Sequence, residues 1–167
     1  KNEWGIKAVR STTDNINNKE FCCVATLYTM LKQISTDVFK AKGNSELTEK
    51  EKISLARDCF KKLCNVLFTA YGVEEFYAQA ANRYTGYPSL WKATKRFLSI
   101  KGWHNYELLA DALSKGFYSR NGKGSAKSVS VNTPQMLLAT ARSDYSNNGR
   151  TEANFHVIES IWKHSNR

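Results

Sequence analysis

The sequence predicts an all-α protein, a single-domain bundle of six or seven helices. Apolar residues recur every three or four positions through most of the chain, which is the spacing of a helix that buries one face. Only two prolines and nine glycines interrupt the 167 residues, and no repeat of fixed period or long linker divides them. A chain of this length can bury a sizeable core without disulfide bonds or a structural metal.

The N-terminal residues 1–18 are polar and rich in asparagine. We expect them to form an arm that either packs on the body or reaches a neighbouring copy. In the second case the arm joins the chain into a homo-oligomer. Residues 19–167 are expected to form the helical domain. Its first helix begins at Lys19 and ends at residues 43–46, with this apolar stripe: Cys23, Leu27, Met30, Leu31, Ile34 and Val38.

The second helix has the clearest boundaries. Thr48 and Glu51 form a capping-box pattern, in which each side chain satisfies a free backbone N–H of the other residue. Gly72 provides a C-terminal stop. The apolar stripe between them consists of Ile53, Ala56, Phe60, Leu63, Leu67 and Ala70. A third helix is predicted over residues 74–83.

The second half of the chain predicts three or four further helices. A fourth begins at residues 87–89 and ends at Gly102, and Asn105 caps a fifth that ends at Gly116. Residues 118–132 are rich in Gly, Ser and cations and predict a mobile loop, in which only the alternating residues 128–131 resemble a strand. Another helix begins at residues 133–134. Thr151 is expected to cap the last, whose stripe is Phe155, Ile158, Ile161 and Trp162.

Positive charge is concentrated in one part of the sequence. The chain has 25 Lys and Arg residues against 15 Asp and Glu, a net charge of +10. Between Arg83 and Lys127 nine basic residues accompany only Glu107 and Asp111. An excess of this kind attracts polyanions, such as nucleic acid, or acidic protein and membrane surfaces.

The helix predicted at 89–101 combines this charge with aromatic residues. At about 100° per residue, its polar arc holds Lys92, Lys95, Arg96 and Ser99. Trp91 lies at the border of the apolar arc, Tyr87 precedes the helix and Trp103 follows it. Rings beside cations suit single-stranded nucleic acid, because cations contact phosphates and rings stack on bases.

The sequence therefore predicts a non-catalytic nucleic-acid-binding protein with a basic groove and limited sequence preference. Single-stranded RNA is favoured over DNA, since no helix-turn-helix is evident, and a nucleoprotein or coat-type subunit fits the polar arm. The expected contacts are Arg83, Tyr87, Trp91, Lys92, Lys95, Arg96, Lys101, Trp103, Arg120, Lys123 and Lys127.

Two alternatives remain open at this stage. The helix 89–101 could be an ordinary amphipathic helix whose basic face is solvated, with residues 118–132 a solvated loop. The chain could instead be a protein-interaction or effector module that binds an acidic partner or an anionic membrane surface. Trp91 and Trp103 would then serve as anchors in a partner's pocket.

Other site classes lack support in the sequence. No catalytic constellation, metal site or cofactor motif is present, and we expect no enzyme activity. We expect the four cysteines, at 22, 23, 59 and 64, to be buried reduced thiols, and His156 to be solvated. No window reaches the roughly 20 apolar residues of a membrane span. The absence of an apolar leader and of an N-glycosylation sequon favours an intracellular location, the cytoplasm over the nucleus.

Overall fold

The computed structural model describes residues 7–9, 20–71, 87–115, 117–120, 128–131 and 147–165. Its five α-helices in these ranges are α1 (Val24–Lys40), α2 (Glu49–Tyr71), α4 (Tyr87–Lys101), α5 (Tyr106–Lys115) and α7 (Asn147–Ser165). Two 3-10 helices, η1 (Lys42–Asn44) and η2 (Trp103–Asn105), precede α2 and α5. The packed body is all-α. The helices predicted over 74–83 and from residue 133 lie outside the described residues.

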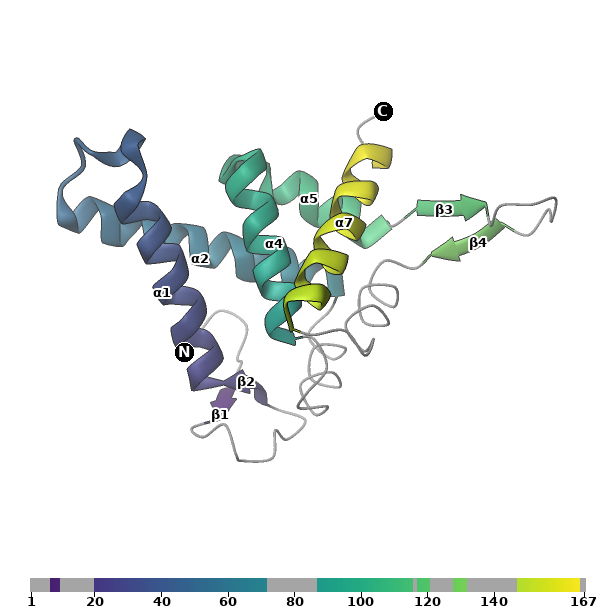
Figure 1. The fold of residues 1–167 in the computed structure, drawn as a ribbon, viewed down its shortest axis with the longest axis horizontal. Coiled ribbons are helices and arrows are strands. Elements are labelled where there is room, and N and C mark those ends of the chain that lie inside the picture. The colour runs from purple at the N-terminus through teal and green to yellow at the C-terminus, as the bar shows by residue number, and fades with distance from the viewer. Residues whose placement is uncertain are drawn as a thin grey trace.

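Helix α4 occupies the middle of the body. It lies between α1 and α7, while α2 and α5 cross behind them (Figure 1). The most extensive helix contacts join α4 to α7, α2 to α5 and α1 to α2. Each of these helices contributes apolar side chains to one buried cluster, among them Ile34, Leu67, Phe97, Leu113 and Ile158. One hydrophobic core therefore holds all five described helices together.

The predicted capping box begins α2. The backbone N–H of Thr48 donates to Glu51 Oε2 at 2.8 Å, and the N–H of Glu51 donates to Thr48 Oγ1 at 3.4 Å. The hydrogen bonds from Thr48 lower the pKa of the Glu51 carboxyl. The helix ends at Tyr71, directly before the predicted stop. Ile53 departs from the predicted stripe, because its side chain is exposed.

The start of the first helix differs from the prediction. Residues Glu20–Cys23 form strand β2, which pairs in parallel with β1 (Lys7–Val9), and α1 begins only at Val24. Four residues are too few to separate the period of a strand from that of one helical turn, so periodicity alone could not assign this segment. Part of the predicted arm thus pairs within its own chain, and the homo-oligomer stays a prediction.

Residues 118–132, predicted as a loop, contain two paired strands. β3 (Phe117–Arg120) runs antiparallel to β4 (Ser128–Val131), with Phe117 opposite Val131 and Arg120 opposite Ser128. The alternation at 128–131 could not be assigned from sequence because a strand needs a partner to be stable. The pair extends away from the helical body beside α7 (Figure 1).

Helix α5 begins at Tyr106, directly after Asn105 as predicted. The side-chain Nδ2 of Asn105 donates to the carbonyl of Lys101 at 2.6 Å, so this residue also satisfies the end of α4. The predicted cap of the last helix is wrong, because Thr151 lies inside α7, which begins at Asn147. By contrast, α4 ends at Gly102 as predicted. The φ of Gly102 is 96°, and a Cβ there would lie 2.5 Å from Cε1 of His104.

Candidate functional site

The basic face predicted on α4 is in contact with acidic side chains of its neighbours. Lys95 Nζ lies 2.6 Å from Oδ2 of Asp37 on α1, and the Lys95 side chain is only 16 % exposed. Arg96 Nη1 lies 2.5 Å from Oε2 of Glu152 on α7. The Arg96 guanidinium also lies over the ring of Phe155, 4.1 Å from its centroid. These two cations therefore connect α4 to the helices on either side.

The sequence could not reveal this neutralisation. No acid lies in the stretch around Lys95 and Arg96, but Asp37 and Glu152 are 58 and 56 residues away along the chain. Only the packing of α1 and α7 against α4 brings them close. The predicted phosphate contacts at Lys95 and Arg96 are thus engaged in ion pairs, although both side chains keep some exposure.

We expect the pair of Lys95 and Asp37 to stabilise the fold. A double-mutant cycle with Lys95→Ala and Asp37→Ala, measured by chemical denaturation, should give a coupling free energy of about 0.5–1 kcal/mol, since Asp37 is half-exposed. The pair of Lys62 and Asp58 within α2, at 2.7 Å, is the matched surface control and should give about 0.3–0.5 kcal/mol. A coupling of zero for Lys95 and Asp37 would contradict this assignment.

The predicted stacking role of Trp91 is wrong. Its side chain is 0 % exposed, and its ring centroid lies 6.0 Å from that of Phe60 on α2. Because α2 covers the side of α4 that the helical wheel left at the border, Trp91 belongs to the core. Trp103 is half-buried and packs against the same cluster. Trp91 therefore cannot present a ring face to a base or anchor a partner.

The remaining predicted contacts are only partly described. Lys92 is half-buried and Lys101 is exposed, and neither forms an ion pair among the described residues. The other five side chains lie outside the described residues: Arg83, Tyr87, Arg120, Lys123 and Lys127. A shared groove between α4 and residues 118–132 thus stays a prediction.

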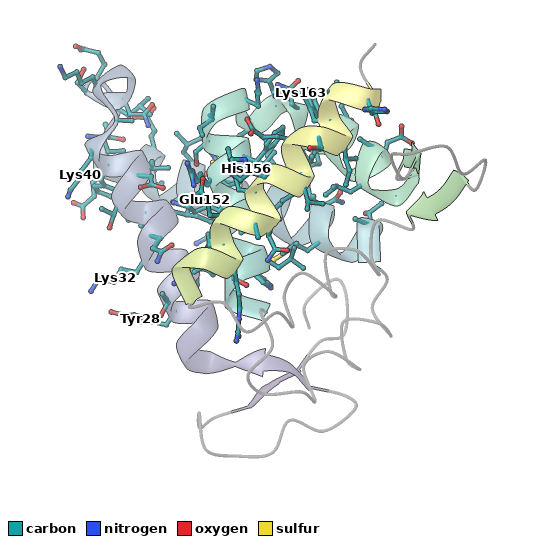
Figure 2. All side chains as sticks on the ribbon, turned by 45° about the vertical axis from the view of Figure 1, so that its right-hand side comes forward. Tyr28, Lys32, Lys40, Glu152, His156 and Lys163 are labelled. Carbon is teal, nitrogen blue, oxygen red and sulfur yellow. The ribbon has the colours of Figure 1, made fainter. Side chains whose placement is uncertain are left out.

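The outward side of α1 combines exposed rings with lysines. Tyr28 is 64 % exposed and Phe39 is 41 % exposed, and Lys32 and Lys40 are exposed as well. The opposite side of the helix is buried in the core. Tyr28, Lys32 and Lys40 extend from α1 away from the other helices (Figure 2). We call Tyr28, Lys32, Phe39 and Lys40 the α1 face.

The electrostatics of the α1 face are positive. Asp37 is the one acidic residue of α1, and its carboxylate is held by Lys95 of α4. Lys52 of α2 adds a cation near the face, with Nζ 5.8 Å from the ring centroid of Phe39. Among the described residues, neither Lys32 nor Lys40 forms an ion pair. The lysines of the α1 face are therefore available to an anion.

The sequence contained a signal for the α1 face that the charge count missed. Tyr28, Lys32 and Phe39 are spaced i, i+4 and i+11, which places them within about 40° of one another around the helix. The predicted buried stripe included Leu31, which is instead 40 % exposed beside this face. The excess positive charge is concentrated in residues 83–127, whereas α1 has only two Lys residues and one Asp, so a charge count does not single out α1.

The described residues contain no group of three or more His, Cys, Asp or Glu side chains that could hold a metal ion. His156 is exposed, as predicted, with its ring nitrogens 3.3 Å from Glu152 and 3.6 Å from Glu159. Cys59 and Cys64 are buried free thiols, also as predicted, and burial raises their pKa values to about 11 and about 12.

Comparison of the chain with protein-family models, with curated proteins and with solved structures gives no match. Among the helices that the structure describes, none has the length and apolar character needed to cross a membrane.

Proposed function

We propose that this protein binds single-stranded nucleic acid through the α1 face, without catalysis and with limited sequence preference. The observation that carries the proposal is the presence of exposed rings and exposed lysines on one outward side of a helix, without an acidic partner among the described residues. The net charge of +10 adds long-range attraction for a polyanion.

The α1 face has the two components that single strands require. A base can stack on an exposed ring for about 1–3 kcal/mol whatever its identity, and cations contact the phosphates. Lys32 follows Tyr28 by one helical turn, about 6 Å along the axis, so one nucleotide can contact both. Phe39 lies about 16 Å from Tyr28 along the same helix, far enough to receive another base.

The rings favour a single strand over a duplex. Bases inside a duplex are already stacked on their neighbours and cannot reach a ring without being extruded. RNA is favoured over DNA, because single-stranded RNA with splayed bases is the usual target of aromatic stacking surfaces. A nucleoprotein or coat-type subunit is one setting for such binding.

The proposal is tested by fluorescence anisotropy with a labelled single-stranded RNA of about 20 nucleotides, over a series of salt concentrations. The protein should bind this RNA more tightly than duplex DNA, with a steep salt dependence. Lys32→Ala should lower the slope of log K against log salt by about 0.7, the value for one phosphate contact on a single strand.

The matched control for Lys32→Ala is Lys163→Ala, because Lys163 is an exposed lysine on α7, distant from the α1 face (Figure 2). This control should leave the slope unchanged. If Lys32→Ala and Lys163→Ala lowered the slope equally, the slope would depend on the net charge of the protein and not on the α1 face. No binding by the wild-type protein at low salt would refute the proposal.

A second candidate function is supported by Leu31. Its exposed aliphatic side chain lies beside Tyr28 and cannot stack on a base, but it can fill an apolar pocket of an acidic protein partner. One variant distinguishes the two functions. Leu31→Ala should weaken binding of such a partner and leave RNA binding intact.

A further inference from the structure

A second row of cations lies on the outward side of α2. Lys50, Arg57 and Lys61 are exposed and spaced i, i+7 and i+11, with exposed Ser54 between the first two. This spacing places them on the side of α2 opposite its core residues, which include Leu63. We call Lys50, Arg57 and Lys61 the α2 stripe.

The acids nearest to the α2 stripe are already engaged, with one exception. Asp58 is held by Lys62 at 2.7 Å, and Glu51 accepts hydrogen bonds from Thr48 in the capping box. Glu49 is exposed at the edge of the stripe. Asp58 is thus paired with a cation, whereas Glu49 and Glu51 keep their negative charge. The five Lys and Arg residues of α2 still outnumber its three acids, so the helix carries a net positive charge.

The α2 stripe differs from the α1 face in one respect. Neither the α2 stripe nor Ser54 beside it provides an aromatic ring. The stripe can therefore contact phosphates, but it offers no surface on which a base can stack. Its axial length from Lys50 to Lys61 is about 16 Å, close to the length of the α1 face. Each surface can therefore hold a short segment of a strand.

The two surfaces meet at one corner of the molecule. Helices α1 and α2 are joined through η1 and diverge from it at an angle (Figure 1). Lys52 Nζ lies 5.8 Å from the ring centroid of Phe39, which places the start of α2 against the end of α1. Lys40 and Lys42 are exposed at this corner. Lys52 lies about 160° around α2 from Lys50, so the cations between the two surfaces are Lys40 and Lys42, with Glu46 as the exposed acid beside them.

We propose that the α2 stripe is a second, phosphate-only contact for the same single strand that stacks on the α1 face. This inference rests on the proposed function. A strand that covers the α1 face continues past η1 and places its next phosphates along α2. A short oligonucleotide occupies the α1 face alone, because only that surface provides stacking. Binding therefore gains a second set of phosphate contacts once the strand is long enough.

The test compares two RNA lengths, about five and about 20 nucleotides, which bracket common site sizes for single strands. Anisotropy titrations at several salt concentrations give the slope of log K against log salt. The double variant Lys50→Ala/Arg57→Ala should lower the slope for the long RNA by about 1.4, two contacts of about 0.7 each. The slope for the short RNA should not change.

Two controls make the result specific. Lys163→Ala removes an exposed charge from α7 and should leave both slopes unchanged. Circular dichroism melting should give the same midpoint for the double variant and the wild type, because both substituted side chains are exposed.

The outcomes separate this inference from the proposed function. Lys32→Ala could lower the salt slope while Lys50→Ala/Arg57→Ala leaves the slope unchanged for both the short and the long RNA. This result would support binding on the α1 face and refute the contact with the α2 stripe. If the double variant lowered the salt slope equally for the short and the long RNA, the inference would also be overturned, because the α2 stripe would then not be a contact reserved for longer strands. If the wild-type protein binds neither RNA, both the proposed function and this inference fail.

Discussion

Trp91→Ala should destabilise the fold by about 3–5 kcal/mol, the usual cost of truncating a buried Trp. The Trp91 side chain is 0 % exposed and packs near Phe60, so its removal leaves a cavity between α4 and α2. The folded fraction should bind RNA as the wild type does, because Trp91 has no exposed ring face. Urea denaturation gives the loss of free energy of unfolding, and anisotropy under stabilising conditions gives the affinity.

Two variants control for this result. Trp91→Phe keeps an aromatic ring in the core and should cost less than Trp91→Ala. Trp103→Ala should also cost less, because Trp103 is only half-buried. A Trp91→Ala protein that kept its stability but lost RNA binding would restore the sequence-based interpretation of Trp91 as a stacking residue, against the structure.

Tyr28→Ala combined with Phe39→Ala should weaken binding of single-stranded RNA by roughly 30-fold or more. Each ring contributes about 1–3 kcal/mol by stacking, and 2 kcal/mol corresponds to about 30-fold in the dissociation constant. The salt slope should not change, because no charge is removed. Stability should hardly change, since both side chains are exposed. Anisotropy titrations at several salt concentrations measure affinity and slope together.

Leu31→Ala is the matched control for the loss of rings, because Leu31 is also an exposed apolar residue of α1. It should leave RNA affinity unchanged, while Tyr28→Phe should preserve affinity by keeping the ring. If Leu31→Ala weakened RNA binding as much as the ring variants, the effect would arise from general apolar contact. Unchanged affinity in the double ring variant would rule out stacking on the α1 face.

The elements that the sequence predicted well depend on local signals. The cap of α2 needs only Thr48 and Glu51, which are three residues apart, and the end of α4 needs only Gly102. The apolar stripe of α7 follows from spacing within one helix, and its residues Phe155, Ile158 and Ile161 are buried as predicted. These features depend only on residues close together in the chain, so the sequence is sufficient to predict them.

The features that the sequence could not predict depend on partners distant along the chain. Residues 128–131 become a strand because they pair with 117–120, and Glu20–Cys23 becomes a strand because it pairs with Lys7–Val9. Lys95 forms an ion pair with Asp37, which α1 supplies from another part of the sequence.

Burial at the border of a helix depends on packing in the same way. The helical wheel left Trp91 at the edge of α4, whereas in the structure it is buried near Phe60 of α2. The α1 face, in contrast, was encoded in the spacing of Tyr28, Lys32 and Phe39. Its exposure becomes evident once the core contacts of α1 are known.

Binding of nucleic acid on the outward side of α1 can be tested residue by residue. The most direct measurement is a 1H–15N correlation spectrum of the labelled protein, titrated with single-stranded RNA of about 20 nucleotides. The largest shift changes should cluster in residues 28–42, followed by residues 50–61. Changes confined to the outward sides of α4 and α7, or no changes at low salt, would contradict this prediction.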